Sequence, residues 1–133
     1  MAELGIGCDV VHSLPGNRRH NLLHVLVDAS TGGILARKVR YARSPLERMR
    51  GLLGRRDEEA ALVIEPARQV HSFGMKKSID VIFCTEDWYV LHVVHRMRPG
   101  RVTRWVTGAR VAIELPAGAA HDVDPGSRIL VRE

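Results

Sequence analysis

Two acidic side chains stand inside apolar runs of this sequence, and they are the residues with the clearest potential for chemistry. Asp80 lies within IDVIFC, and Glu114 lies within RVAIEL. A carboxylate that leaves water without partners is costly, so such a residue is normally hydrogen-bonded, ion-paired or part of a functional site. If the two segments are strands that share a sheet face, Asp80 and Glu114 approach each other.

The segment just before Asp80, HSFGMKKS at residues 71–78, offers side chains that could complete a site. Two carboxylates with His71 could bind a divalent cation or act in acid–base chemistry, as a metal-assisted or hydrolase-type enzyme. Apolar residues beside acidic groups are also the usual lining of a small ligand pocket. The sequence therefore predicts a ligand pocket formed by His71, Ser72, Phe73, Met75, Asp80 and Glu114.

Asp80 also has a purely structural interpretation. The backbone amides, serine hydroxyls and lysines of loop 71–78 could all serve an anion that follows them directly in the chain. We favour this interpretation over catalysis. We predict that Asp80 is mostly buried, accepts hydrogen bonds from its own loop and lies at the edge of a pocket shared with Glu114 or His71.

The sequence lacks the motifs of the commonest enzyme classes. It contains no HExxH, no phosphate-cradling glycine loop and no nucleophile elbow. Its two cysteines, Cys8 and Cys84, do not form a CxxC pair, and we expect them to be reduced thiols. We favour a binding or accessory module for a small ligand or a peptide segment over an enzyme, and we predict neither a metal nor a cofactor.

The chain is basic, with 20 Lys and Arg against 15 Asp and Glu, a net charge of +5 and a pI near 9.9. Arginines concentrate over Arg96–Arg110, where Trp105 stands among them. Arginine beside an aromatic ring suits contact with nucleic acid, which makes a non-specific nucleic-acid binder a third alternative. No nucleic-acid motif accompanies these charges, so we favour a solvated face and do not expect nucleic acid as a partner.

The elements that must position these residues are mostly short strands. Runs rich in β-branched residues alternate with turns marked by Gly and Pro, which is typical of a β-sandwich or barrel. STGG at residues 30–33 predicts a hairpin connection. The fold class predicted is mainly β, with strands over residues 22–29, 34–41, 61–65, 79–84, 88–95, 110–115 and 128–131.

One segment has the pattern of a short amphipathic helix, at about residues 45–54. Ser44 can cap it, Glu47 completes a capping box and Gly54 can end it. Its apolar residues recur at helical spacing, which gives one stripe to pack on a sheet.

The predicted domain organisation is one β-rich domain over residues 21–133 after a loosely ordered arm at residues 1–20. The first residues carry Glu3 and only a few apolar side chains, so they do not resemble an export signal. No run approaches the roughly 20 apolar residues of a spanning helix. We expect a cytoplasmic protein without a membrane partner.

An ordered set of segments resembles domain-of-unknown-function family 192, which comprises small prokaryotic proteins. After Ala42 the segments are ERMRGLLGR at 47–55, HSFGMKKSIDVIF at 71–83, MRP at 97–99, IELPAG at 113–118 and PG at 125–126. The resemblance implies a compact β-rich domain with one short helix. The chain departs from the family at Gly74, where many members have tryptophan, at Lys77-Ser78, and at Ser127, where an aspartate is usual; the first of these implies a smaller pocket wall.

Overall fold

The computed structural model describes residues 24–42 and 60–133, and every regular element in these ranges is a strand. The prediction of a mainly β fold is confirmed. The predicted helix at about residues 45–54 and the predicted arm at residues 1–20 lie outside the described residues. The strands are β1 (Val25–Asp28), β2 (Ile34–Ala36), β3 (Lys38–Ala42), β4 (Ala60–Ile64), β5 (Ile79–Cys84), β6 (Val90–Met97), β7 (Val111–Pro116) and β8 (Ile129–Arg132).

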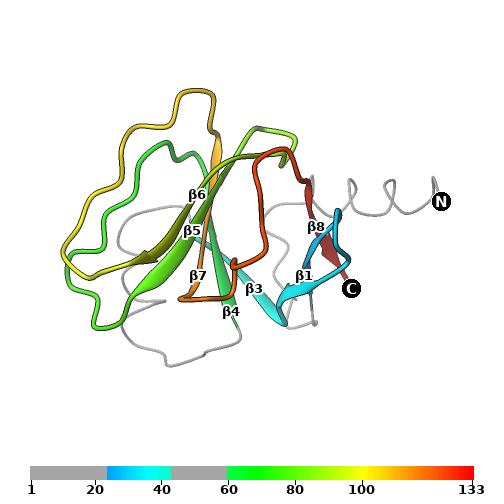
Figure 1. The fold of residues 1–133 in the computed structure, drawn as a ribbon, viewed down its shortest axis with the longest axis horizontal. Helices are drawn as coiled ribbons and strands as arrows, with labels where there is room; N and C mark the ends of the chain where they lie inside the picture. Colours follow the sequence, from blue (N-terminus) through cyan, green and yellow to red (C-terminus); the bar gives the residue numbers. More distant parts are fainter. Residues whose placement is uncertain (1–23, 43–59) are drawn as a thin grey trace.

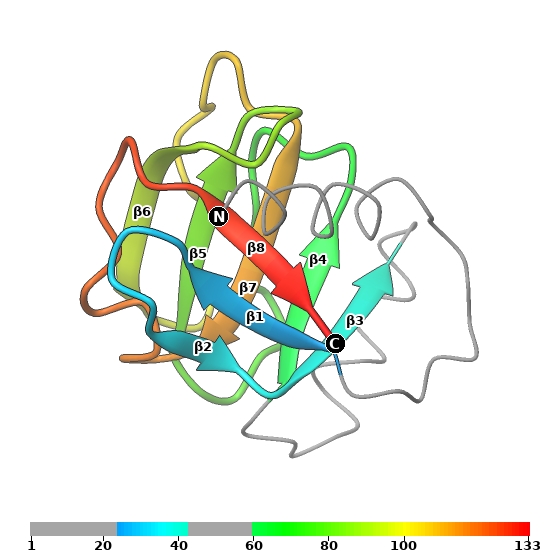
Figure 2. The ribbon, with the colours of Figure 1, turned by 90° about the vertical axis from the view of Figure 1, so that its right-hand side faces the viewer.

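The strands form two sheets that face each other. The smaller sheet has the order β2-β1-β8, and the larger has the order β3-β4-β7-β5-β6. All neighbours are antiparallel except β3 and β4, which are parallel. Figure 1 shows the two sheets side by side, and Figure 2 shows β1 and β8 lying obliquely across the front of the larger sheet. This is the sandwich arrangement among the two predicted alternatives.

The run at residues 34–41 forms two strands, whereas its sequence predicts one. β2 pairs with β1 in the small sheet, and after Arg37 the chain passes to the large sheet, where β3 pairs with β4. Each half has a β-strand pattern, so the local sequence does not reveal where the chain changes sheets. The partner strands decide that position.

The space between the sheets is the main hydrophobic core. The small sheet contributes Leu26, Ile129 and Val131, and the large sheet contributes residues such as Ile82 and Ile113, all of them fully buried. Trp88 closes this core beside Val90. In the described part of the chain, no helix is long and apolar enough to cross a membrane.

The other face of the large sheet is also covered, which explains why β5 is buried at every position. A second apolar cluster there joins Val81, Phe83 and Ala112 of the strands to Val70 and Val106 of two long loops. A strand covered on both faces needs apolar residues at successive positions, and IDVIFC has them. Asp80 is the exception in that run, and its environment is described next.

Candidate functional site

Asp80 is fully buried at the start of β5, where its carboxylate accepts three backbone hydrogen bonds. Oδ1 accepts from the N–H of Arg96 at 2.8 Å, and Oδ2 accepts from the N–H groups of Gly118 at 3.0 Å and Ala120 at 2.8 Å. Bonds from N–H groups to an ionised carboxylate are stronger than neutral ones. The prediction of a buried, hydrogen-bonded Asp80 is confirmed, but the donors are not in loop 71–78 as we expected.

Each donor to Asp80 lies in an irregular segment that needs an anchor. Arg96 adopts a φ of 52° within a β-bulge, where β6 has an extra residue opposite β5. Gly118 and Ala120 lie in the turns that follow β7. Asp80 therefore holds the bulge of β6 and the β7–β8 connection against the inner face of the large sheet, which is a structural task.

Asp80 and Glu114 do not share a face, so the prediction that they approach each other is wrong. The strand register pairs Asp80 with Leu115 and Val81 with Glu114. Residues paired directly across antiparallel strands point the same way, so Asp80 lies with Leu115 towards the main core, and Glu114 lies with Val81 on the opposite face. The sequence shows the alternation within each strand but not the register between strands.

The same register separates the three groups that a metal-assisted or acid–base enzyme would need. Asp80 faces the small sheet, whereas Glu114 and the buried part of loop 71–78 belong to the other face of the large sheet. Within residues 24–42 and 60–133, no group of three His, Cys, Asp or Glu side chains is placed to hold a metal ion. Of the six predicted pocket residues, Asp80 stands apart from the others.

Two long loops cover the face that carries Glu114. Loop 65–78 connects β4 to β5, and loop 98–110 connects β6 to β7. They run antiparallel and hydrogen-bond along their length, from Ala67 N–H with Arg110 C=O at 3.0 Å to Ser72 N–H with Arg101 C=O at 2.9 Å. We call them the paired loops; Figure 1 shows them together at the left of the molecule, in green and yellow.

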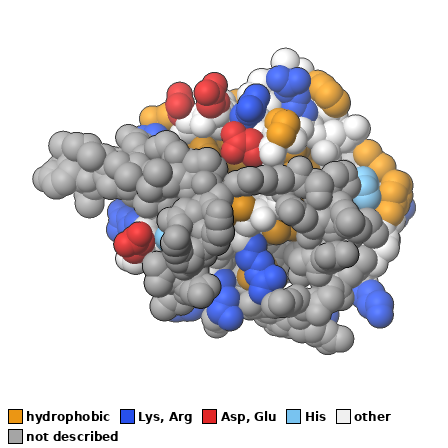
Figure 3. Space-filling model, turned by 180° about the vertical axis from the view of Figure 1, so that it is seen from behind, with side chains coloured by type: hydrophobic (Ala, Val, Ile, Leu, Met, Phe, Trp, Pro, Cys, Tyr) orange, Lys and Arg blue, Asp and Glu red, His pale blue; other side chains and the backbone are white. Residues whose placement is uncertain are grey.

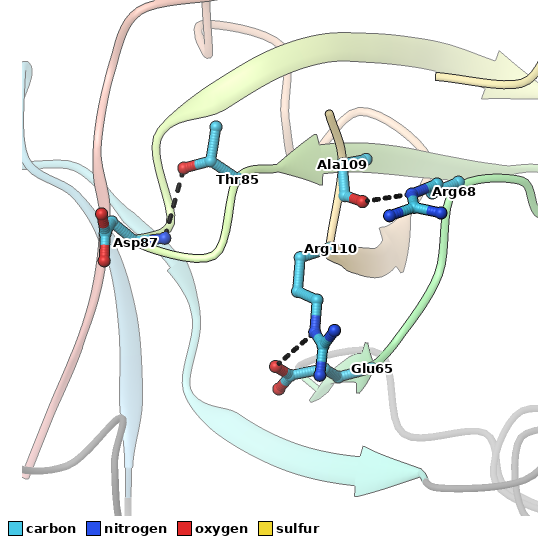
Figure 4. A network of polar contacts seen from close by, with 6 residues as sticks. All are labelled: Glu65, Arg68, Thr85, Asp87, Ala109 and Arg110. Atoms are coloured by element: carbon cyan, nitrogen blue, oxygen red, sulfur yellow. Dashed lines mark hydrogen bonds and ion pairs between the residues drawn. The ribbon is translucent and has the colours of Figure 1, made fainter. Parts of the chain in front are cut away.

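The base of the paired loops is held by arginine side chains. Arg68 Nε donates to the carbonyl of Ala109 at 3.1 Å, and Arg110 Nε lies 3.5 Å from a carboxylate oxygen of Glu65. Figure 4 shows both contacts, with the two arginines on opposite loops. Further along, the hydroxyl of Thr103 accepts from the N–H of Val70 at 3.0 Å.

Ser72 joins the tips of the paired loops. Its side chain is buried, donates to the carbonyl of Arg98 at 2.7 Å and accepts from the N–H of Arg101 at 2.9 Å. Its carbonyl accepts from the N–H of Gly100 at 3.0 Å. Gly100 has a φ of 80°, a conformation that favours glycine and follows Pro99 naturally in a turn. The tips are thus defined by a specific hydrogen-bond network.

Phe73, His71 and Val102 form an apolar row at these tips. The rings of His71 and Phe73 are stacked at 4.9 Å, and the N–H of Phe73 donates to His71 Nδ1 at 3.3 Å. His71 pairs with Val102 across the loops, so their side chains are neighbours. Phe73 and Val102 are each 51% exposed, whereas Ser72 and Met75 of loop 65–78 are buried.

Met75 follows Phe73 by two residues and is buried in the apolar cluster with Ile79 and Met97. It therefore fills the space between loop and sheet. The predicted pocket residues thus divide by position: His71 and Phe73 face outward, Ser72 and Met75 support them, Glu114 is buried on the sheet below, and Asp80 is on the far face.

A second exposed ring lies nearer the base of the paired loops. Trp105 is 57% exposed, and the guanidinium of Arg68 lies 5.9 Å from its ring centroid. Figure 3, seen from the side opposite to Figure 1, shows hydrophobic side chains beside a histidine at the end formed by the paired loops.

Positive charge surrounds the exposed rings. Glu65 is the single acid of the paired loops, and it contacts Arg110. Partial burial lowers the pKa of His92 on neighbouring β6, and the positive charges of Arg104 and His95 lower it further. The cations of the paired loops are Arg68, Lys76, Lys77, Arg98, Arg101, Arg104 and Arg110.

Asp28 is a buried carboxylate that our sequence reasoning missed. It lies at the end of β1, where Oδ1 accepts from the backbone N–H and the hydroxyl of Ser30, both at 3.0 Å. The Ser30 hydroxyl in turn lies 2.9 Å from that of Ser127. The sequence signal was an acid at the end of an apolar run, followed by Ser and Gly, which is typical of a turn. In the structure, Ser30 connects this turn to Ser127.

The chain matches the model of family DUF192, described as "Uncharacterized ACR", over residues 26–131. It is also similar to the UPF0127 protein PH1112 of Pyrococcus horikoshii, with 32% identity over 93 residues. This similarity covers 66% of the present chain and 80% of the relative.

Two crystal structures share the fold. A protein of unknown function from Novosphingobium aromaticivorans has a TM-score of 0.65 and 17% identity over 81% of this chain and 83% of that protein. A candidate transcription regulator from Sinorhizobium meliloti has a TM-score of 0.62 and 21% identity over 81% of this chain and 91% of that protein. At these identities the likeness establishes the fold alone.

Proposed function

This chain belongs to DUF192, a family whose description assigns no activity, and on that premise we propose that it is a binding module whose contact surface is the tip of the paired loops. The observation that carries the proposal is the exposure of Phe73 and Val102 on a hydrogen-bonded support. Single exposed apolar side chains are common, but neighbouring ones that form a patch mark interaction sites.

The support is what distinguishes this row from an isolated exposed side chain. Ser72 bonds loop 98–110 through its backbone N–H, its carbonyl and its hydroxyl, and Met75 is buried in the apolar cluster on the sheet. A surface that is already ordered loses little conformational freedom on binding. The paired loops therefore suit docking of a segment that is itself flexible, and we assign a peptide segment of a partner as the ligand.

The proposal revises the predicted pocket in one respect. His71, Ser72, Phe73 and Met75 remain in the site as its outward row and its support, whereas Asp80 is removed because it serves the other face of the sheet. Glu114 lies on the covered face below the loops and is not assigned a contact with the partner.

A random peptide library displayed on phage tests this function. The immobilised protein should enrich peptides, and Phe73→Ser and Val102→Ser should each reduce the recovery of those peptides by about tenfold, because a few central apolar residues supply most of the binding energy of such contacts. Ile34→Ser is the matched control, since Ile34 is 52% exposed on β2, in the other sheet. Equal recovery by all three variants would refute the proposed surface.

A further inference from the structure

The charge of the paired loops is far more one-sided than that of the whole chain. The chain as a whole has 20 basic and 15 acidic residues, yet the paired loops carry the single acid Glu65 against the cations named above. Glu65 already contacts Arg110 at the base of the loops, away from the tips. Among the residues of the paired loops, the charged side chains near the tips are therefore lysines and arginines.

The cations stand around the apolar row and not within it. Lys76 and Lys77 follow Phe73 in loop 65–78, while Arg98 and Arg101 flank the turn of loop 98–110 beside Val102. Lys76, Arg98 and Arg101 are exposed, and among the described residues no acidic side chain forms an ion pair with any of these three. An apolar centre with a charged, solvated rim is the usual anatomy of a protein–protein contact.

We propose that the partner segment is an acidic peptide with one large apolar anchor: the anchor packs on Phe73 and Val102, and carboxylates on both sides of it meet the arginines and lysines of the rim. This inference rests on the proposed function and adds the chemistry of the partner. Complementary charge raises the rate of association and excludes basic partners, while the apolar anchor supplies most of the affinity.

The geometry favours an acidic peptide over single-stranded nucleic acid. Nucleic-acid platforms stack successive bases on free ring faces along a basic track. Here His71 is stacked on one face of Phe73, and Arg68 lies over the ring of Trp105, so both exposed rings of the paired loops already have one neighbour on a face. Val102, at the other end of the row from Phe73, is aliphatic and offers no stacking surface.

Fluorescence anisotropy with four labelled probes tests the inference. The first is a peptide in which glutamates flank one central phenylalanine on both sides. The second carries serine in place of the phenylalanine, the third carries lysines in place of the glutamates, and the fourth is an oligothymidylate of equal length. We expect the first peptide to bind at least about tenfold more tightly than each of the others, and its affinity to fall as salt screens the charges.

Charge-reversal variants locate the effect. Arg98→Glu with Arg101→Glu should weaken binding of the acidic peptide by about tenfold or more, whereas Arg37→Glu with Arg132→Glu, exposed positions outside the paired loops, should leave it within about twofold. Tighter binding of the oligothymidylate than of the acidic peptide overturns the inference in favour of nucleic acid.

Different results would refute the binding surface and the acidic nature of the partner. If the phage library yields neutral or basic peptides whose binding still requires Phe73, the binding function stands and the acidic partner is refuted. If the selected peptides do not depend on Phe73 or Val102, the surface itself is refuted. An acidic peptide that binds equally well with serine as with phenylalanine at its centre refutes the anchor.

Discussion

Asp80 illustrates how one buried side chain can organise distant backbone. Its two oxygens accept from Arg96, Gly118 and Ala120, so removal of the carboxylate leaves three N–H groups without their acceptor. We predict that Asp80→Ala lowers the free energy of unfolding by about 2–4 kcal/mol, since each buried unsatisfied group costs about 1–3 kcal/mol and part of that cost is relieved by relaxation. Urea unfolding of both proteins measures this, with the exposed Asp122→Ala as the control.

Hydrogen exchange on the same pair shows which segment depends on Asp80. Protection should fall first at Gly118 and Ala120 in Asp80→Ala, while the amide of Met75 in loop 71–78 keeps its protection. Loss of protection at Met75 with Gly118 and Ala120 unchanged would show that Asp80 serves the loop that precedes it in sequence, contrary to this structure.

Because of Cys84, we predict that the free energy of unfolding falls as the pH rises above about 9. Burial raises the pKa of the Cys84 thiol from 9.0 to about 12. Below about pH 9 the Cys84 thiol is protonated in both the folded and the unfolded protein. Above about pH 9 the thiol ionises in the unfolded protein first, so the free energy of unfolding falls. This fall ends near pH 12, where the thiol of the folded protein ionises too. The loss is about 1.4 kcal/mol for each pH unit in that window.

The comparison with Cys84→Ala isolates this effect from other titrating groups. The free energy of unfolding of the wild type minus that of Cys84→Ala is the quantity to compare. We predict that this difference is about 1.4 kcal/mol smaller at about pH 10 than at about pH 8. A difference that is constant across this range would mean that the Cys84 thiol ionises equally in both states.

At the scale of elements, the paired loops depend on Ser72 more than on any apolar contact at their tips. Its hydroxyl bonds the carbonyl of Arg98 and the N–H of Arg101. We predict that Ser72→Ala costs about 1–3 kcal/mol in unfolding free energy, because it removes the partner of a carbonyl and an N–H that are both partly buried.

The consequence of Ser72→Ala should be local. Hydrogen exchange should accelerate at Gly100, Arg101 and Thr103 before it changes in β5, since the first three amides bond across the loops. Ser78→Ala is the control, because the Ser78 hydroxyl forms no hydrogen bond with the described residues. Unchanged exchange at the loop tips would show that packing alone holds the loops together.

The strands could be predicted from sequence because each is a local pattern. IDVIFC and VAIEL are buried on both faces and, apart from Asp80 and Glu114, are continuous apolar runs; STGG marks the β1–β2 hairpin, where Gly32 has a φ of 78°. The face of each residue within one strand also follows from alternation. What did not follow is the relation between strands: the register that separates Asp80 from Glu114 depends on how β5 pairs with β7.

The site was only partly predictable for the same reason. Loop 71–78 stood out because of its unusual composition, and the stretch Arg96–Arg110 stood out because of its charge. The antiparallel pairing of the two through Ser72 and through His71 with Val102 depends on contacts about thirty residues apart in the chain, which no local pattern encodes. In the sequence, loop 71–78 and the arginine-rich stretch are therefore separate features, whereas in the structure they lie together.

At the scale of the whole molecule, the two faces of the large sheet have different surroundings. The small sheet and the inner face of the large sheet form the main core, and Asp80 and Asp28 fasten connections to it. The outer face of the large sheet carries the paired loops, at the end of the molecule away from β1 and β8 (Figure 1). One face of the large sheet thus belongs to the main core, and we propose that the loops on the other face serve recognition.

The most direct test of this division is a chemical-shift titration of the isotopically labelled protein with the acidic peptide that carries one phenylalanine. We predict that the perturbed amides cluster at residues 71–75 and 98–105, with little change in β1, β2 and β8, and that Phe73→Ser abolishes the perturbations. Perturbations centred on the small sheet or on the β7–β8 connection, with the paired loops unaffected, would contradict it.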